Sequence, residues 1–200
     1  MDTILDDYLW TVDLGQTIDK QTLTVQCMAM ERLLQSNFKI DESASDVYGT
    51  FTTKLFREYN FFTFTSPEIL KLYSELVEHL TPLVDPNRQY VMQAWVNVYR
   101  AGQFIDWHTH WEPELGAYHG FYCLNVGKSQ TYYRFEHDKE TIHTVNDTDG
   151  LIVFGKSAGD EHKSSEWNET DPRITIAFDL IPVESIKEQF IINHYIPFKG

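Results

Sequence analysis

The sequence predicts a single domain that is mainly β, with one or two helices before the strands. The chain has 200 residues, of which 42% are hydrophobic, so it can bury a sizeable core. The longer helical patterns lie in the first half, whereas seven or eight short stretches rich in β-formers follow residue 89. Turn residues separate these stretches, and many short strands joined by turns are typical of a sandwich or a jelly-roll barrel.

Two helices are expected in the first half of the chain. Residues 22–35 carry apolar side chains at mostly helical spacing. The second helix has a strong start, because Ser66 is a good N-terminal cap and Pro67 favours the first helical position. It should run to about residue 84, with the inward side chains Ile69, Leu70, Leu72, Tyr73, Leu76, Val77 and Leu80. Residues 8–14 are interpreted as a short strand, and residues 36–59 as a loop that holds at most one short strand.

The second half is interpreted as a succession of strands. They are expected at residues 90–99, 105–112, 116–125, 129–137, 141–145, 151–154, 161–165 and 173–181. A turn is expected at residues 146–150 and a short helix at residues 184–191. We therefore divide the single domain, residues 1–200, into a helical support layer (1–88), a jelly-roll core (89–182) and a C-terminal tail (183–200).

Charge and cysteine content narrow the classes of function. The formal net charge of −14 disfavours nucleic acids and anionic membranes as partners, although a local arginine can still attract an anionic ligand into a pocket. Cys27 and Cys123 lie far apart, so no disulfide framework is expected and a cytoplasmic location is favoured. The N-terminus lacks the pattern of a signal peptide, and no apolar run approaches the ~20 residues of a membrane span.

Residues 105–112 carry the strongest chemical signal. In a β-strand every second side chain points the same way, so one face of this stretch would hold Asp106, His108, His110 and Glu112. Neighbours on that face lie roughly 6.5–7 Å apart, so two of them can bind one metal ion but three cannot easily do so. The practical pairs are His108 with His110, or His110 with Glu112. A third ligand must come from elsewhere in the chain.

His162 is the candidate for that third ligand, about fifty residues after His108. Imidazole binds iron, zinc and copper, and three protein ligands on one face leave open positions that suit Fe(II). Arg173 follows His162 by eleven residues, at the start of the next expected strand. A guanidinium there could hold a carboxylate through two parallel hydrogen bonds. The remaining histidines, His119 among them, are expected to be ordinary surface or core residues.

In pattern and order these residues resemble the Fe(II)/2-oxoglutarate oxygenase superfamily, in particular its prolyl-hydroxylase-like branch and related hydroxylases of marine phages. The family motif is His-x-Asp/Glu, then a distal His, then an Arg or Lys. The resemblance covers roughly residues 90–182 and rests on Trp95-Val-Asn97-Val-Tyr99, His108-Thr-His110, Gly120-Phe-Tyr122-Cys-Leu124, Gly150-Leu-Ile-Val-Phe154, His162 and Arg173. It implies a double-stranded β-helix, which is a cupin-like jelly-roll, supported by the N-terminal helices.

The resemblance also implies roles for individual residues. His108 matches the first iron ligand and His162 the distal one. Arg173 matches the residue that grips the C5 carboxylate of 2-oxoglutarate, and Tyr99 matches a tyrosine near that cosubstrate. Further polar groups of the pocket are expected to be Asn97, Tyr122 and Thr175.

The sequence departs from the family motif at one position. The slot for the acid, two residues after His108, holds His110, so a metal site of three histidines is favoured. Glu112 would then orient the His110 ring without binding the metal itself. The alternative register uses His110 and Glu112 as ligands, which restores a triad of two histidines and one carboxylate.

The resemblance implies a dioxygenase that uses Fe(II) and 2-oxoglutarate, hydroxylates a small-molecule or peptidyl substrate, and releases succinate and CO2. One alternative is a three-histidine, cupin-like metalloenzyme that does not use 2-oxoglutarate and requires no role for Arg173. Another is a non-catalytic jelly-roll binding module. A homodimer is a further expectation, through exposed edge strands or the aromatic segment at residues 61–64.

Overall fold

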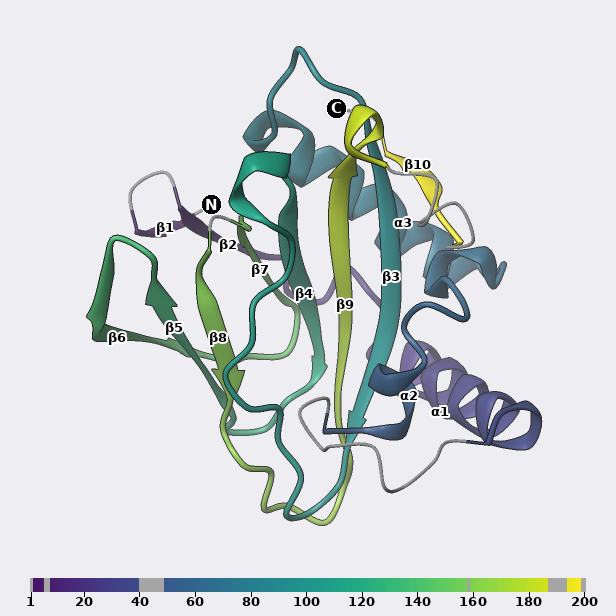
Figure 1. Ribbon diagram of the computed structural model, residues 1–200. Helices are drawn as coiled ribbons and strands as arrows, with labels where there is room; N and C mark the ends of the chain where they lie inside the picture. The colour runs from purple at the N-terminus through teal and green to yellow at the C-terminus, as the bar shows by residue number, and fades with distance from the viewer. Residues whose placement is uncertain (1, 6–7, 40–48, 158, 187–193, 199–200) are drawn as a thin grey trace.

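Two antiparallel β-sheets and a layer of helices make up the computed structural model, which describes residues 2–5, 8–39, 49–157, 159–186 and 194–198 (Figure 1). The larger sheet has seven strands in the order β1 (Asp2–Leu5), β2 (Leu9–Asp13), β7 (Leu151–Lys156), β4 (Tyr118–Asn125), β9 (Arg173–Pro182), β3 (Tyr90–Tyr99) and β10 (Ile196–Phe198). The smaller sheet has three, in the order β6 (Asp138–Asn146), β5 (Gln130–Phe135) and β8 (Glu161–Ser164). This confirms the predicted β-rich jelly-roll with N-terminal helices.

The centre of the larger sheet is built from three long antiparallel strands; β3 and β9 pair in continuous register, whereas the β4–β9 register shifts between Cys123 and Asn125. β9 lies between β3 and β4, and Tyr99 is opposite Arg173 while His119 is opposite Asp179. Because side chains alternate along a strand, one face of β9 carries Arg173, Thr175, Ala177 and Asp179. These four residues line a cavity between the two sheets, and the residues between them pack in the core.

Two helices cover the other face of the larger sheet (Figure 1). α1 (Lys20–Asn37) begins at Asp19, whose carboxylate accepts a hydrogen bond from the Thr22 amide at 3.1 Å. α3 (Pro67–Leu80) begins as predicted, because the Ser66 hydroxyl accepts from the Ile69 amide at 3.2 Å. Its buried stripe repeats every three or four residues, at Ile69, Leu72, Leu76 and Leu80. Leu70 was expected to point inward, but it is 49% exposed because it lies outside that stripe.

Several short segments differ from the expectation. Within residues 36–59 the structure has a helical turn, α2 (Phe51–Lys54), instead of a strand, and residues 40–48 lie outside the described part. Most of the helix expected at residues 184–191 also lies outside the described residues, and η5 (Val183–Ser185) precedes them. The 3-10 helices η2 (Phe61–Thr63), η3 (Thr81–Leu83) and η4 (Pro113–Leu115) complete the structure. Both ends of the chain add a strand to the larger sheet, since β2 pairs with β7 and β10 with β3.

Two of the three phenylalanines in the aromatic segment at residues 61–64 are buried. Phe61 and Phe62 are both buried in the main core, so these two rings are not available to a dimer interface. Of the helices in the described ranges, none has both the length and the apolar composition needed to cross a membrane.

Candidate metal centre

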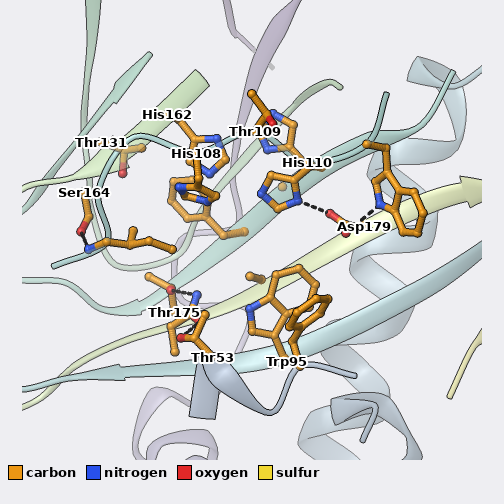
Figure 2. A pocket seen from close by; sticks show the side chains of 18 of the residues that line it. Thr53, Trp95, His108, Thr109, His110, Thr131, His162, Ser164, Thr175 and Asp179 are labelled. Atoms are coloured by element: carbon orange, nitrogen blue, oxygen red, sulfur yellow. Dashed lines mark hydrogen bonds and ion pairs between the residues drawn. The ribbon is translucent and has the colours of Figure 1, made fainter. Parts of the chain in front are cut away.

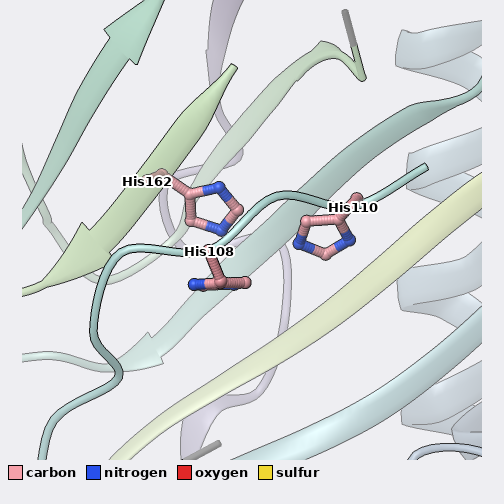
Figure 3. Close-up of side chains that lie close together, drawn as sticks. All are labelled: His108, His110 and His162. Carbon is pink, nitrogen blue, oxygen red and sulfur yellow. The ribbon is translucent and has the colours of Figure 1, made fainter. Parts of the chain in front are cut away.

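Three histidines converge on one point between the two sheets (Figure 3). One ring nitrogen each of His108, His110 and His162 lies within 4.8 Å of the others. His162 lies in β8, and His108 pairs with it through two backbone hydrogen bonds of 3.0 and 3.1 Å. Directly opposed residues of antiparallel strands hold their side chains close together, so this pairing brings the two distant histidines into contact. The structure thus brings together the three residues that the sequence proposed as ligands.

Residues 105–112 are not the regular strand that was expected. Only His108 forms a β-bridge, and the segment then runs irregularly to η4. The irregular path still directs His108 and His110 to the same point, with their ring centroids 5.4 Å apart. Glu112 is exposed and is not part of the histidine cluster, so the alternative register receives no support from the geometry.

Hydrogen bonds fix the tautomers of two histidines. His108 Nδ1 donates to the carbonyl of Asp106 at 2.8 Å, and His110 Nδ1 donates to Oδ1 of Asp179 at 2.7 Å. Since these oxygens only accept, each Nδ1 carries the hydrogen and each Nε2 keeps a lone pair. His162 is buried, and its Nδ1 has no hydrogen-bond partner among the described residues. Two lone pairs held toward one point, beside the buried imidazole of His162, are what a metal ion needs from its ligands.

The lowered pKa values of two of the histidines also favour metal binding. Burial, together with the neighbouring His110, lowers the pKa of His108 to about 4. Burial and the adjacent histidines hold the pKa of His162 well below its usual range. Neutral imidazole is the form that binds metal, so these ligands need not lose a proton at neutral pH. A set of three imidazoles suits iron, zinc or copper, and the residues therefore fit Fe(II).

The histidines line a cavity of about 480 Å³, a volume typical of sites for small molecules (Figure 2). Arg173 and Tyr99 line it at one end of β9 and β3, and Asp179 and Trp95 line it further along these strands. Asn97 and Thr175 lie between these ends. They are linked by a hydrogen bond of 3.2 Å, and Thr53 of α2 donates to Asn97 at 2.6 Å.

Arg173 is buried in the cavity wall and already has an ionic partner. Its Nη2 donates to Asp147 at 3.0 Å, and its Nε donates to Ser129 at 2.9 Å. The ring of Tyr99 lies 5.1 Å from the guanidinium carbon, and burial raises the pKa of this phenol to about 12. A guanidinium has five N–H donors, so these contacts leave donors for a ligand carboxylate. Sequence reasoning missed Asp147, which falls in the expected turn at residues 146–150.

Tyr122 is the one sequence-proposed pocket residue that the structure places elsewhere. Its neighbour Phe121 lines the cavity, so Tyr122 points to the opposite face of β4, where its strand partner is Ile176. Burial raises the pKa of the Tyr122 phenol, and the acids that influence it include Glu68 of α3. Tyr122 thus belongs to the packing between sheet and helices.

Two residues near the metal centre were missed. His119, expected to be ordinary, is buried with its ring centroid 4.8 Å from that of His110 and 4.7 Å from that of His162. Asp179 takes the orienting role that was expected of Glu112. Its alternation with Arg173 along β9 is a signal that could have placed it on the cavity face, although not as the partner of His110, whereas nothing around His119 in the sequence separates it from a core histidine.

Solved structures with the same fold include two prolyl hydroxylases. That of Trichoplax adhaerens, in complex with a peptide of hypoxia-inducible factor, has a TM-score of 0.61 at 12% identity and covers 90% of this chain and 86% of its own. The prolyl-4-hydroxylase of Pseudomonas putida has a TM-score of 0.59 at 10% identity, with 87% and 92% covered.

The non-heme monooxygenase ThoJ, in its nickel complex, is also similar, with a TM-score of 0.64, 12% identity, and 98% of this chain and 82% of that chain covered. No protein-family model matches the sequence, and no curated protein matches it significantly. At these identities the likeness concerns the fold. The chain therefore has the double-stranded β-helix fold of the Fe(II)/2-oxoglutarate oxygenase superfamily.

Proposed function

We propose that the protein is an Fe(II)- and 2-oxoglutarate-dependent dioxygenase that hydroxylates a small-molecule or peptidyl substrate and releases succinate and CO2. The observation that carries this proposal is the presence of three converging histidines and a buried arginine in the walls of one cavity. The metal ligands would be His108, His110 and His162. When bound, Fe(II) with 2-oxoglutarate supplies the oxidising chemistry, and the chain positions and shields the reactants.

The residues along β3 and β9 are suited to hold the cosubstrate. Arg173 would bind the carboxylate distant from the metal, with Tyr99 packed against the guanidinium. Asn97 and Thr175, which lie between this end and the histidines, would contact the body of the molecule. Their mutual hydrogen bond, with Thr53 behind it, keeps both side chains in place without a ligand.

The other end of the cavity is suited to the substrate. Phe56, Trp95 and Trp111 give it aromatic walls. The buried Nε1 of Trp95 has no hydrogen-bond partner among the described residues, so it is a donor for an oxygen atom of a ligand. The Trichoplax prolyl hydroxylase binds a peptide, which supports keeping a peptidyl substrate alongside small molecules. Both cysteines are free and buried, and this suits the cytoplasmic location that we propose.

The test is turnover of 2-oxoglutarate. Protein loaded with Fe(II) should convert 2-oxoglutarate to succinate in air, slowly even without substrate, and His162→Ala should not. If the loaded protein forms no succinate and does not bind 2-oxoglutarate, the proposal fails.

A second candidate, a three-histidine metalloenzyme that does not use 2-oxoglutarate, is favoured by one contact. The charge of Arg173 is already compensated by Asp147, which weakens its attraction for a second carboxylate. The same binding experiment separates the two candidates, because the second predicts metal binding without any affinity for 2-oxoglutarate.

A further inference from the structure

One buried carboxylate accepts hydrogen bonds from two consecutive residues of the segment 105–112, which carries His108 and His110. Asp179 accepts from His110 Nδ1 through Oδ1 at 2.7 Å and from Trp111 Nε1 through Oδ2 at 2.9 Å (Figure 2). Its side chain is 6% exposed, and it projects from the central strand β9. The segment that carries His110 is irregular, so strand pairing does not set the direction of this ring. The contact with Asp179 does so, from a rigid sheet.

The same contact bears on the charge of the metal centre. Three neutral imidazoles bring no negative charge to a divalent cation, whereas a triad with one carboxylate brings one. A buried carboxylate that accepts the Nδ1 hydrogen of a ligating histidine raises the basicity of the ligand and fixes its tautomer. We propose that Asp179 is a positioning residue that orients His110 and supplies, through it, the negative charge that the three-histidine ligand set lacks. This inference rests on the proposed metal site and is independent of 2-oxoglutarate.

The first experiment removes the charge and keeps the shape. In Asp179→Asn the amide nitrogen can donate to His110 Nδ1, which would move the ring hydrogen to Nε2 and remove the lone pair needed by the metal. The affinity for Ni(II) or Co(II), measured by calorimetry without 2-oxoglutarate, should fall by about 10- to 100-fold. The visible spectrum of the Co(II) protein should also change, which a loss of stability alone would not cause.

A matched control is available in α1. Glu31 is another buried carboxylate, paired with Arg100 at 2.7 Å, and it does not line the cavity. Glu31→Gln should therefore leave metal affinity and the Co(II) spectrum unchanged, even if it lowers the unfolding temperature. Metal affinity of Asp179→Asn equal to that of the wild type would overturn the proposal.

A second experiment tests the charge argument directly. His110→Asp introduces the acid of the family motif, but it places a second carboxylate beside Asp179. Their repulsion favours a proton shared between the two acids, and this proton competes with the metal, so metal binding should be weak. Adding Asp179→Asn removes the repulsion, so the double variant should bind Ni(II) at least about 10-fold more tightly than His110→Asp alone. An additive loss in the double variant would contradict the inference.

If the wild type binds metal but does not turn over 2-oxoglutarate, only the proposed function fails. A wild type that binds no metal overturns both.

Discussion

At the level of single residues, the chemistry depends on which nitrogen of each imidazole carries the hydrogen. The Asp106 carbonyl and the Asp179 carboxylate both hold the hydrogen on Nδ1, so His108 and His110 present Nε2 to the same point. The sequence could predict the three histidines from their spacing. It could not predict their hydrogen-bond partners, because Asp179 reaches His110 only after β9 is placed in the larger sheet.

His108→Ala and His162→Ala should each abolish tight metal binding, because two imidazoles alone do not complete a facial site. Glu112→Ala is the matched control, since Glu112 also lines the cavity but is not part of the histidine cluster. Metal content after dialysis, measured by mass spectrometry, checks the prediction. A strong loss of metal in Glu112→Ala would instead favour the register in which Glu112 is a ligand.

Arg173 cannot be tested cleanly by a single substitution. Arg173→Ala would leave Asp147 buried and unpaired, which typically costs about 3–5 kcal/mol of stability. The double variant Arg173→Gln with Asp147→Asn replaces the ion pair by a neutral pair. It should retain metal and lose most affinity for 2-oxoglutarate, as measured by calorimetry on the Ni(II) protein. Unchanged 2-oxoglutarate affinity would remove Arg173 from the proposed site and favour the metalloenzyme that does not use it.

At the level of elements, alternation of apolar and polar residues was the most informative signal. It predicted β9 to within one residue at its end, while richness in β-formers predicted β3 at its observed bounds, Tyr90–Tyr99. Alternation failed for residues 105–112, which alternate well but form a β-bridge only at His108, with one further backbone hydrogen bond from the Ser164 amide to the Ile105 carbonyl. A pattern of side chains cannot show whether a partner strand is present along the whole segment. The pairing with β8 ends at His108. The irregular chain after it places His110 at the cavity.

The close packing of β4 leads to a prediction about Gly120. A Cβ atom there would lie 2.6 Å from the Val153 carbonyl oxygen and 2.7 Å from the ring of Phe178. Gly120→Ala should therefore lower the free energy of unfolding by about 2–3 kcal/mol, as measured by urea denaturation. Gly15→Ala, with nothing within 4 Å of the added atom, should cost only the strain of its left-handed backbone, about 1 kcal/mol. Equal effects of the two substitutions would contradict this account of the packing.

For the whole molecule, the buried histidines make the stability of the metal-free protein depend on pH. The pKa of His108 is lowered from 6.5 to about 4, so the unfolded chain binds more protons than the folded one between these values. The free energy of unfolding should fall as pH decreases through this window, with about 3 kcal/mol lost through His108 alone by pH 4. His119 and His162 act in the same direction.

Urea denaturation of metal-free protein at several pH values measures this dependence, and His108→Asn should reduce it by the His108 contribution. A stability that is constant between pH 6.5 and pH 4 would show that these histidines are not buried as neutral groups.

Short strands joined by turns predicted a sandwich or a jelly-roll, and the family resemblance narrowed this to the double-stranded β-helix that the structure has. The buried ion pair of Arg173 with Asp147 was not predicted, because Asp147 sits in a stretch whose composition is that of an exposed turn. A polar residue can be buried in the cavity wall because it has a hydrogen-bond or ionic partner there. That partner is far away in the sequence, so the sequence pattern does not show it.

The central claim is that one metal held by three imidazoles shares a cavity with an arginine that binds a dicarboxylate. Titration of 2-oxoglutarate into the Fe(II)-loaded protein without air, followed by visible absorption, tests it most directly. The account predicts a charge-transfer band that saturates at one 2-oxoglutarate per iron and is absent from His162→Ala. Iron-loaded protein that develops no band at saturating 2-oxoglutarate would contradict it.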